Sequence, residues 1–363
     1  MADEEPALFR AFPDLRARLP HRPFLSGPTR VEPLELGAAA GAELYVKRDD
    51  TSCALYGGNK PRKLEFVLGR AAARGARRLV TTGALGTHHG LATTILGRAL
   101  GLRTTLVLVS QPVTPHVRET LALQAAYGAE LVYGAHVAGT AAQVLRVLAA
   151  SQLRGERPYR VPTGGSSALG NLGFVSAALE LAEQVRAGLL PEPARIFVPV
   201  GTGGTQVGLV LGLRMAGLRS RVVGVLVTDI LPPSPRRLAR AARRALRLLR
   251  RADPRVPRVD VAPADFALVR NQLGAGYGAP TPAARAAVEA AARCGLALET
   301  TYTGKSLAAI LAELASGGLR EQPVLFWNTH NSLDVARLAP SAPRVEALPA
   351  RFRRLLRESG DVD

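Results

Sequence analysis

The chain has 363 residues, a length that suits two domains sharing an interface better than one compact domain. Hydrophobic residues make up 47% and charged residues 21%, so we expect a large buried core and no extensive disorder. No apolar run approaches the ~18 residues of a membrane span, and Cys53 and Cys294 alone give neither a disulfide framework nor a metal-site spacing. The acidic start, MADEEPALFRAF, lacks the features of a signal peptide, so a cytoplasmic location without membrane attachment is expected.

Short β-branched runs alternate with helical patterns along most of the chain. Strands are predicted at 77–82, 104–110, 129–134, 159–164, 195–200, 221–227 and 323–329. Connections this short between strands and helices imply parallel sheets with helices on both faces. The sequence therefore predicts an α/β protein of two domains, each a mostly parallel twisted sheet covered by helices.

The segment YGGNKPRKLEF places Lys60 at the start of a predicted helix. Asn59 can cap this helix, and Pro61 suits its first turn. The helix macrodipole disfavours an ammonium group at this end, so the pKa of Lys60 is expected to be lowered. A neutral lysine amine can form a Schiff base with a carbonyl compound. An exposed lysine at a helix start is the alternative interpretation.

A glycine-containing turn in TTGALGTHHGLATT, at 81–94, lies between a predicted strand and a helix. Hydroxyl and backbone N–H groups in such a turn can bind a carboxylate. The adjacent residues His88 and His89 point in different directions on a helix, so no metal site is expected here. A surface or capping role is the alternative for either histidine.

The next turn, GTGGT at 201–205, follows the strand at 195–200 and precedes a helix. Its backbone N–H groups and threonine hydroxyls can converge on a phosphate, which the helix N-terminus also favours. It is not a P-loop, because no Gly-Lys-Ser/Thr follows the glycines. A dinucleotide turn with Asp229 as ribose ligand is an alternative, which would make the protein a nicotinamide-dependent oxidoreductase. A strand–helix turn without a ligand is a further alternative.

Part of the net charge of +18 is concentrated in RRLARAARRALRLLRR at 236–251. At helical spacing its apolar residues form one stripe, made of Leu238, Ala242, Ala245 and Leu249. No aromatic residue interleaves the arginines to stack on bases, so we expect a solvated helix face. Binding of nucleic acid through this face is an alternative of a different functional class.

Two tyrosines lie in loops of the C-terminal half, Tyr277 in GAGYGAP and Tyr302 in ETTYTGKS. Tyr302 is predicted to follow the C-terminal end of a strand, where ligands gather in open parallel sheets. Thr303, the next residue, can offer a hydroxyl to a ring nitrogen. A packing role is the alternative for both tyrosines.

Taken together, these segments resemble the pyridoxal-phosphate enzymes of the tryptophan synthase β fold (fold type II), and most of all the branch of D-cysteine desulfhydrase and 1-aminocyclopropane-1-carboxylate (ACC) deaminase. The matching segments, in chain order, are PTRVEPLELG, LYVKRDD, YGGNKPRKLE, GGSSALGNLGFVSAALEL, GTGGTQVGL, YGAP and YTGKS. They span nearly the whole chain, and GGNKxRKLE is specific to this branch.

The resemblance implies pyridoxal 5'-phosphate as the cofactor, held by Lys60 through a Schiff base. The other cofactor contacts that it implies are Asn59, His88, Thr202, Gly203, Gly204, Thr205 and Thr303. The contacts that it implies for a small amino-acid substrate are Thr87, His88, His89 and Tyr302. Lys60, or Tyr302 or Tyr277 as a tyrosinate, would take the proton from the substrate Cα. No metal is implied, and because relatives of this kind are commonly homodimers, a homodimer is expected.

Position 303 helps to choose within the branch. ACC deaminases typically carry a glutamate there, near the pyridine nitrogen, whereas this chain carries Thr303, as D-cysteine desulfhydrases do. A neutral hydroxyl leaves that nitrogen largely unprotonated, which suits loss of a β-leaving group better than opening of a cyclopropane. The resemblance therefore favours a lyase or deaminase that gives pyruvate, ammonia and the leaving group by α,β-elimination. ACC deamination, racemisation and β-replacement are alternatives on the same scaffold.

Two segments depart from the family pattern. Thr87-His88-His89 stands where Ser-Asn-His/Gln is usual. Thr87 can still hold the substrate carboxylate, and His88 can stack on the cofactor ring and reach its phenolic oxygen. NTHNS at 328–332 stands where a small Gly-Gly segment is usual, so bulkier polar groups are expected to reshape the pocket.

We expect three stretches of chain to build the two domains. Residues 1–62 form the N-terminal part of the large domain, 63–165 form a small α/β domain, and 166–363 form the remainder of the large, cofactor-binding domain. The glycine-rich segment PTGGSSALG at 162–170 is the expected crossing point between them.

Overall fold

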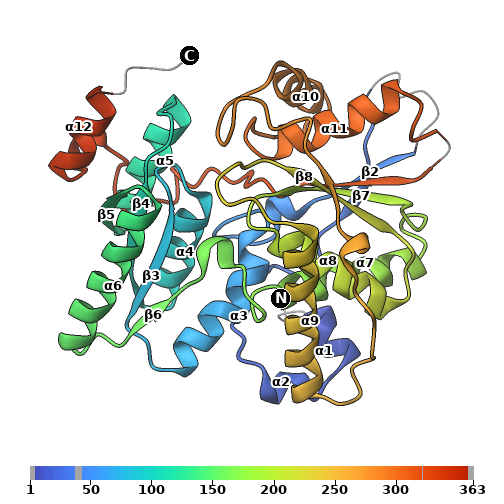
Figure 1. Cartoon of the computed structure of the whole chain (residues 1–363), viewed down its shortest axis with the longest axis horizontal. Helices are drawn as coiled ribbons and strands as arrows, with labels where there is room; N and C mark the ends of the chain where they lie inside the picture. The colour runs from blue at the N-terminus through green and yellow to red at the C-terminus, as the bar shows by residue number, and fades with distance from the viewer. Residues whose placement is uncertain (1–4, 37–42, 321, 359–363) are drawn as a thin grey trace.

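The computed structural model describes residues 5–36, 43–320 and 322–358 and shows two β-sheets flanked by helices (Figure 1). The acidic residues 1–4 and the chain end at 359–363, which the predicted large domain includes, lie outside the described residues. The predicted α/β class with two mostly parallel sheets is confirmed.

The smaller sheet has four parallel strands in the order β5-β4-β3-β6. Its strands and flanking helices are β3 (Arg78–Ala84), α4 (His88–Ala99), β4 (Arg103–Val109), α5 (Pro115–Ala126), β5 (Glu130–Ala135), α6 (Val137–Leu153) and β6 (Pro158–Arg160). Successive side chains of a strand point to opposite faces. Accordingly, Leu106 and Leu108 pack in the cluster that includes α5, while Val107 packs against Val144 of α6. Helices therefore cover both faces (Figure 1).

The larger sheet has six strands in the order β1-β2-β10-β7-β8-β9, and only the edge strand β1 runs antiparallel to its neighbour. The strands are β1 (Val31–Pro33), β2 (Leu44–Lys47), β7 (Arg195–Val200), β8 (Arg221–Leu226), β9 (Ala267–Val269) and β10 (Val324–Trp327). The helices are α7 (Leu172–Arg186), α8 (Gly204–Ala216), α9 (Pro235–Ala252), α10 (Pro282–Arg293) and α11 (Thr303–Ala315). Ile196 and Val198 pack on the side of α7 and α8, and Phe197 packs on the side of α10 and α11.

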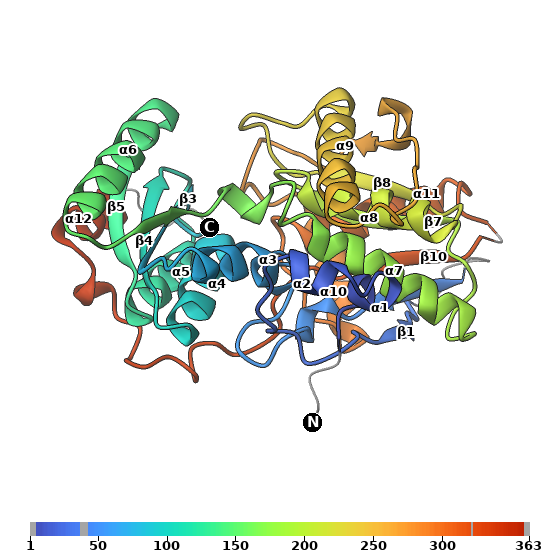
Figure 2. The same cartoon turned by 90° about the horizontal axis from the view of Figure 1, so that it is seen from below.

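The remaining elements join or extend these two units. They are the helices α1 (Ala7–Ala11), α2 (Leu15–Arg18), α3 (Lys60–Ala73) and α12 (Ala350–Glu358) and the 3₁₀ turns η1 (Asp49–Thr51), η2 (Thr163–Gly165), η3 (Pro263–Asp265) and η4 (Val345–Ala347). The chain returns to the small unit at its end, where Phe352 and Leu356 of α12 pack with Leu121 of α5 (Figure 2). The domain boundaries at 62/63 and 165/166 stay a prediction, and we propose that α12 joins the small domain.

Three short strands escaped the sequence-based prediction, and the strands predicted at 159–164 and 323–329 are shorter than expected. β1 and β9 have three residues each, too few to show an alternating pattern, and β2 carries the buried Lys47. The strand predicted at 159–164 is limited to β6, because the chain then turns into η2, where Gly164 has a φ of 64°.

The arginine-rich segment forms α9, and its predicted apolar stripe is buried. Leu238, Ala242, Ala245 and Leu249 are at most 2% exposed, while most of the arginines face outward. The helix is therefore held to the large unit by its apolar stripe. Within the described part of the chain, no helix combines the length and apolar character needed to cross a bilayer.

Candidate active site

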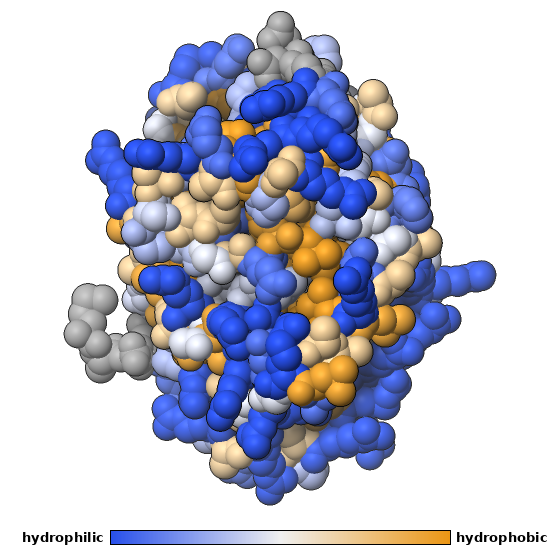
Figure 3. Space-filling model, turned by 90° about the vertical axis from the view of Figure 1, so that its left-hand side faces the viewer, coloured by the Kyte–Doolittle hydropathy of each residue, from blue (hydrophilic) through white to orange (hydrophobic). Residues whose placement is uncertain are grey.

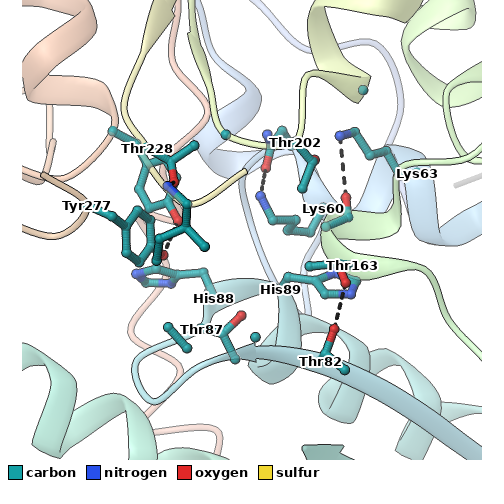
Figure 4. A pocket seen from close by; sticks show the side chains of 18 of the residues that line it. Lys60, Lys63, Thr82, Thr87, His88, His89, Thr163, Thr202, Thr228 and Tyr277 are labelled. Atoms are coloured by element: carbon teal, nitrogen blue, oxygen red, sulfur yellow. Dashed lines mark hydrogen bonds between the residues drawn. The ribbon is translucent and has the colours of Figure 1, made fainter. Parts of the chain in front are cut away.

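A cavity of about 660 Å³ is lined by residues of both units. The predicted site residues that line it are Asn59, Lys60, Thr87, His88, His89, Thr202, Gly203, Gly204, Thr205, Tyr277, Tyr302 and Thr303. They come from segments more than two hundred residues apart in the sequence, and Figure 4 shows Lys60 and Thr202 from the large-unit side together with His88 and His89 from α4. All of the predicted site residues thus meet in one place.

Lys60 is the first residue of α3, directly after a turn that only glycine suits. Gly58 has a φ of 83°, and a Cβ there would lie 2.6 Å from the carbonyl oxygen of Thr329. Lys60 Nζ donates to Asn59 Oδ1 at 2.6 Å, and Asn59 Nδ2 donates to Thr205 Oγ1 at 3.2 Å. The expected capping role of Asn59 was wrong, because its side chain makes these contacts instead of accepting from the helix N–H groups.

The pKa of Lys60 is lowered, as predicted, to about 8, but the main cause differs from the one expected. Burial of the amine lowers it, and the carboxylate of Glu299 opposes this change. Desolvation penalises the charged form of any amine, whichever end of a helix it occupies. The cavity therefore holds a lysine whose neutral form is accessible close to neutral pH.

A buried ion cluster fixes the start of α3. Arg62 donates to Asp49 Oδ2 at 2.9 Å and to Glu180 Oε2 at 2.9 Å. Lys47 Nζ donates to Glu180 Oε1 at 2.6 Å, and Trp327 Nε1 donates to Asp49 Oδ2 at 2.7 Å. Although burial alone would raise it, the charges of Arg62 and Lys47 lower the pKa of Glu180 to about 2. Side chains from β2, η1, α7 and β10 thus hold the helix that carries Lys60.

The glycine turn at 201–205 forms the opposite wall, at the N-terminus of α8. Gly203 has a φ of 82°, and a Cβ on Gly204 would lie 2.3 Å from Ser166 Oγ. Thr202 Oγ1 and Ser166 Oγ are hydrogen bonded at 2.6 Å. The converging N–H groups and hydroxyls of such a turn bind phosphate groups.

Lys63, which the sequence reasoning gave no role, lies beside this turn. Its Nζ is 3.4 Å from both Ser166 Oγ and the carbonyl oxygen of Gly164, and it lines the cavity. Burial, and then the charge of Lys60, lower the pKa of Lys63 well below its ordinary value. An anion bound in the glycine turn would favour the charged form of Lys63 and so oppose this lowering of its pKa. The sequence did contain a signal for this role of Lys63. It lies three residues after Lys60, and residues i and i+3 share a helix face.

The turn before α4 presents a threonine and two histidines. Thr87 Oγ1 caps α4 by accepting from the N–H of Gly90 at 3.2 Å. His88 projects into the cavity (Figure 4), whereas His89 is buried and bonds to Thr81 Oγ1 at 3.0 Å. Burial, and then the charge of Lys60, lower the pKa of His89 to about 3, so His89 stays neutral.

Tyr277 and Tyr302 meet across the cavity, with their hydroxyl oxygens 2.5 Å apart. The prediction that Tyr302 follows a strand was wrong, since it stands at the N-cap of α11 after an irregular loop. Burial raises the pKa of both phenols. A tyrosinate is therefore disfavoured at neutral pH.

Thr303 lies next to a carboxylate that the sequence reasoning missed. Its Oγ1 donates to Glu299 Oε1 at 3.1 Å, and the same carboxylate accepts from the N–H groups of Tyr302 and Thr303. Acidic side chains are favoured at a helix N-terminus, so the position of Glu299 just before α11 was a usable signal. Glu299 lines the cavity and is the negative charge that acts on Lys60.

Two further segments place histidines beside His88. His116 of α5 lies beside His88, with ring centroids 5.0 Å apart, and His330 lies 6.3 Å from His88. His330 comes from the NTHNS segment at 328–332, which therefore does place polar groups on the wall. Over the described ranges, no group of three or more His, Cys, Asp or Glu side chains is arranged to hold a metal ion.

Asp229, considered above as the ribose ligand of a dinucleotide site, makes a structural contact instead. Its Oδ1 accepts the N–H of Tyr277 at 3.0 Å, so the side chain organises the tyrosine loop. The geometry instead suits a phosphorylated aldehyde, because Lys60 offers an amine and the glycine turn with Lys63 offers donors that could hold a phosphate.

Comparison with known proteins gives the class. A family model described as pyridoxal-phosphate dependent enzyme matches residues 24–330, and the chain belongs to this family. Its cofactor is pyridoxal 5'-phosphate. The alternative of a nicotinamide-dependent oxidoreductase is thereby set aside.

Individual relatives narrow the class to a branch. The chain is 31% identical over 323 residues to a D-cysteine desulfhydrase of Klebsiella pneumoniae strain 342, covering 86% of this chain and 94% of the relative. A D-cysteine desulfhydrase of strain ATCC 700721 / MGH 78578 is 30% identical with the same coverage. A solved structure of an ACC deaminase homologue matches with a TM-score of 0.76 and 30% identity, over 90% of this chain and 95% of that one.

The fold is shared more widely. A hydrogen sulfide-producing enzyme from Fusobacterium nucleatum matches with a TM-score of 0.58 at 13% identity, over 85% of this chain and 94% of that one. That likeness concerns the fold alone. The protein is a pyridoxal-phosphate-dependent lyase or deaminase of fold type II, in the branch of D-cysteine desulfhydrase and ACC deaminase.

Proposed function

We propose that the protein removes a β-substituent from a small amino acid by α,β-elimination, as a D-cysteine desulfhydrase does, and releases pyruvate and ammonia. The observation that carries the proposal is the Lys60 amine, which has a pKa of about 8 and faces the same cavity as the phosphate-type turn at 201–205. The relatives named D-cysteine desulfhydrase support the choice of reaction.

The proposed roles follow from the contacts of each side chain. Lys60 attaches the cofactor and then acts as base toward the substrate Cα, because its pKa is lowered to about 8 while burial raises the pKa of the phenols of Tyr277 and Tyr302. Thr202 and Lys63 hold the phosphate, and the bound cofactor supplies the electron sink. Thr87, at the N-terminus of α4, takes the substrate carboxylate.

Thr303 supports elimination over cyclopropane opening. Its neutral hydroxyl is bonded to Glu299, and the carboxylate is held behind it by this hydroxyl and by the N–H groups of Thr301, Tyr302 and Thr303. A ring nitrogen next to Thr303 would meet a hydroxyl and not a carboxylate. We infer that the Thr303 hydroxyl would turn its hydrogen from Glu299 to this nitrogen in the loaded enzyme, which would leave the nitrogen unprotonated and suit substrates with a good β-leaving group such as cysteine.

Reductive labelling tests the role of Lys60. The chain has four lysines, Lys47, Lys60, Lys63 and Lys305, so borohydride reduction of the cofactor-loaded protein followed by peptide mapping identifies the attachment point. We expect the label on Lys60 alone, and Lys60→Ala should lose it. Label retained on another lysine in Lys60→Ala would contradict the assignment.

The reaction is tested by measuring keto-acid release from D-cysteine, L-cysteine, D-serine and ACC. Pyruvate from a cysteine is the expected result. Release of 2-oxobutyrate from ACC alone would make the protein an ACC deaminase and refute the proposed reaction.

A homodimer and a cytoplasmic location stay proposals. The homodimer follows from the family resemblance, and Leu153 of α6, which is 90% exposed, is an apolar side chain that such an interface would bury. Figure 3 shows apolar side chains among charged ones on the side of the molecule that carries α6 and α12. Light scattering of the purified protein measures the oligomeric state directly.

A further inference from the structure

A line of hydrogen bonds leads from the cavity to the surface, and the proposed roles above do not use it. Tyr56, in the loop before α3, is bonded through its hydroxyl to His88 Nδ1 at 2.8 Å. His88 Nε2 is bonded to His116 Nε2 at 2.9 Å. Tyr56 is 1% exposed and lines the cavity with His88, whereas His116 of α5 is exposed. The line thus has one buried end and one end in solvent.

The surroundings keep the inner part of the line uncharged. Burial, and then the charges of His116, His330 and Lys60, lower the pKa of His88 well below its ordinary value. Burial, and then the carboxylate of Glu299, raise the pKa of Tyr56. A neutral imidazole between two polar partners donates through one nitrogen and accepts through the other.

The protonated state of Tyr56 sets the direction of the hydrogen bonds from Tyr56 through His88 to His116. A buried phenol that stays protonated must place its hydrogen on an acceptor, and the partner of Tyr56 is His88 Nδ1. His88 then carries its own proton on Nε2 and donates it to His116 Nε2. The proton of neutral His116 is consequently on Nδ1. Each group in the resting chain donates outward.

We propose that Tyr56, His88 and His116 form a proton relay that connects the active site with solvent. This inference rests on the proposed function, because amine chemistry at Lys60 requires proton transfer. An amino acid enters as an ammonium ion and must lose a proton before its nitrogen can attack. The ammonia released at the end regains one. Each turnover therefore needs one proton to leave the cavity and one to return.

The bonds balance in both directions. When the Tyr56 oxygen accepts a proton from the cavity, it releases its own to His88 Nδ1, His88 releases the Nε2 proton to His116 Nε2, and His116 loses its Nδ1 proton to water. Every donor in the line now points inward. A proton taken up by His116 Nδ1 can then travel back by the reverse steps. One outward passage thus prepares the line for one inward passage without rotation of a ring.

Replacement of the outer residue tests the relay with little risk to the fold, because His116 is exposed. His116→Ala should lower kcat by about a hundredfold, the lower end of the effect of positioned proton-transfer groups. Added imidazole should restore much of this loss by occupying the space of the missing ring. Glu119→Ala, an exposed change on the same helix α5, serves as the control and should keep the wild-type kcat.

A double variant separates the relay from independent effects. Tyr56→Phe keeps the ring and removes the inner hydroxyl, so it should slow turnover by itself. Because both changes interrupt one line, adding His116→Ala should lower kcat little further. Additive losses, an unchanged kcat in His116→Ala, or a loss that imidazole does not rescue would each overturn the relay.

A measurement on the cofactor-free protein is independent of turnover. Nitrogen-15 NMR of the histidine rings at about pH 8, where free histidine is neutral, should show His88 protonated on Nε2 and His116 on Nδ1. A His88 ring that carries its proton on Nδ1 or on both nitrogens would overturn the assignment. If the wild type releases keto acid but the relay tests fail, the proposed function stands and the relay is wrong. If the wild type releases no keto acid from any amino acid, the proposed function fails. The NMR result then still shows whether the hydrogen bonds from Tyr56 to His116 run in the assigned direction.

Discussion

At the scale of single residues, the chemistry depends on how the cavity changes the acid–base properties of a few groups. Burial moves the pKa of Lys60 down to about 8 and the pKa values of the Tyr277 and Tyr302 phenols up. The amine is consequently the group that gains reactivity, while the phenols become hydrogen-bond donors. Glu299 limits the change at Lys60, because a nearby negative charge favours the ammonium form.

Capture of the cofactor by the cofactor-free protein should follow the pKa of Lys60. The neutral amine attacks the aldehyde, so the rate should rise about tenfold per pH unit below pH 8 and level off above it. An exposed lysine would give a rise that continues to a pH of about 10.4. Stopped-flow absorbance after mixing with pyridoxal phosphate measures the rate, and Glu299→Gln should shift the plateau to lower pH. A rate still rising above pH 9.5, about 1.5 units past the expected midpoint, would contradict the assigned pKa.

At the scale of elements, the position of Lys60 depends on how α3 is held. Arg62, two residues after Lys60, is 1% exposed and lies between Asp49 and Glu180. A buried cation between two carboxylates leaves uncompensated charge when it is removed. The helix that presents the amine is therefore fixed by electrostatic contacts as well as by the apolar side of Leu64 and Leu68.

Arg62→Met should lower the free energy of unfolding by about 3–5 kcal/mol, since Asp49 and Glu180 would stay buried with fewer cationic partners. Urea unfolding measures the change, and Arg70→Met on the same helix is the control, expected within about 0.5 kcal/mol of the wild type.

The pH dependence gives a second check on this cluster. The pKa of Glu180 is depressed from 4.5 to about 2 in the folded protein, so its contribution is complete above pH 4.5 and is lost as the pH falls toward 2. The difference between Arg62→Met and the wild type should therefore shrink over this range. A difference that is below 1 kcal/mol at pH 7, under a third of the expected loss, would show that the cluster does not hold α3.

At the scale of the whole molecule, two sheets share one cavity and a strongly basic surface surrounds them. The glycine turn at 201–205 lies on the large unit and the turn that carries Thr87 lies on the small unit, so the cavity is complete only where the units meet. The net charge of +18 is carried in part by α9, whose apolar stripe packs on the large unit and whose arginines face outward. These arginines do not line the cavity.

The triple variant Arg240→Gln, Arg244→Gln and Arg247→Gln should keep keto-acid release at the wild-type level, because these exposed side chains lie outside the cavity. Its unfolding free energy should change by about 0.5 kcal/mol or less per substitution. Retention on immobilised DNA should weaken and should fall steeply with salt in both proteins. Tight, sequence-selective DNA binding by the wild type that the triple variant loses would restore the nucleic-acid interpretation.

Some features of this protein could be predicted from the local sequence pattern alone. The alternation of short apolar runs and helical segments predicted two parallel sheets, because strand and helix periods are properties of neighbouring residues. The placement of Lys60 at a helix start and of 201–205 between a strand and a helix was likewise predicted from adjacent residues. Such features need no knowledge of distant segments.

Other features were decided only by the tertiary structure. His88, His116 and His330 are far apart in the sequence and meet because three elements converge on one cavity. The role of burial in lowering the pKa of Lys60 could not be predicted either, and the helix macrodipole was given too much weight. Desolvation depends on every atom that replaces water around a group, and those atoms come from segments brought together only by folding.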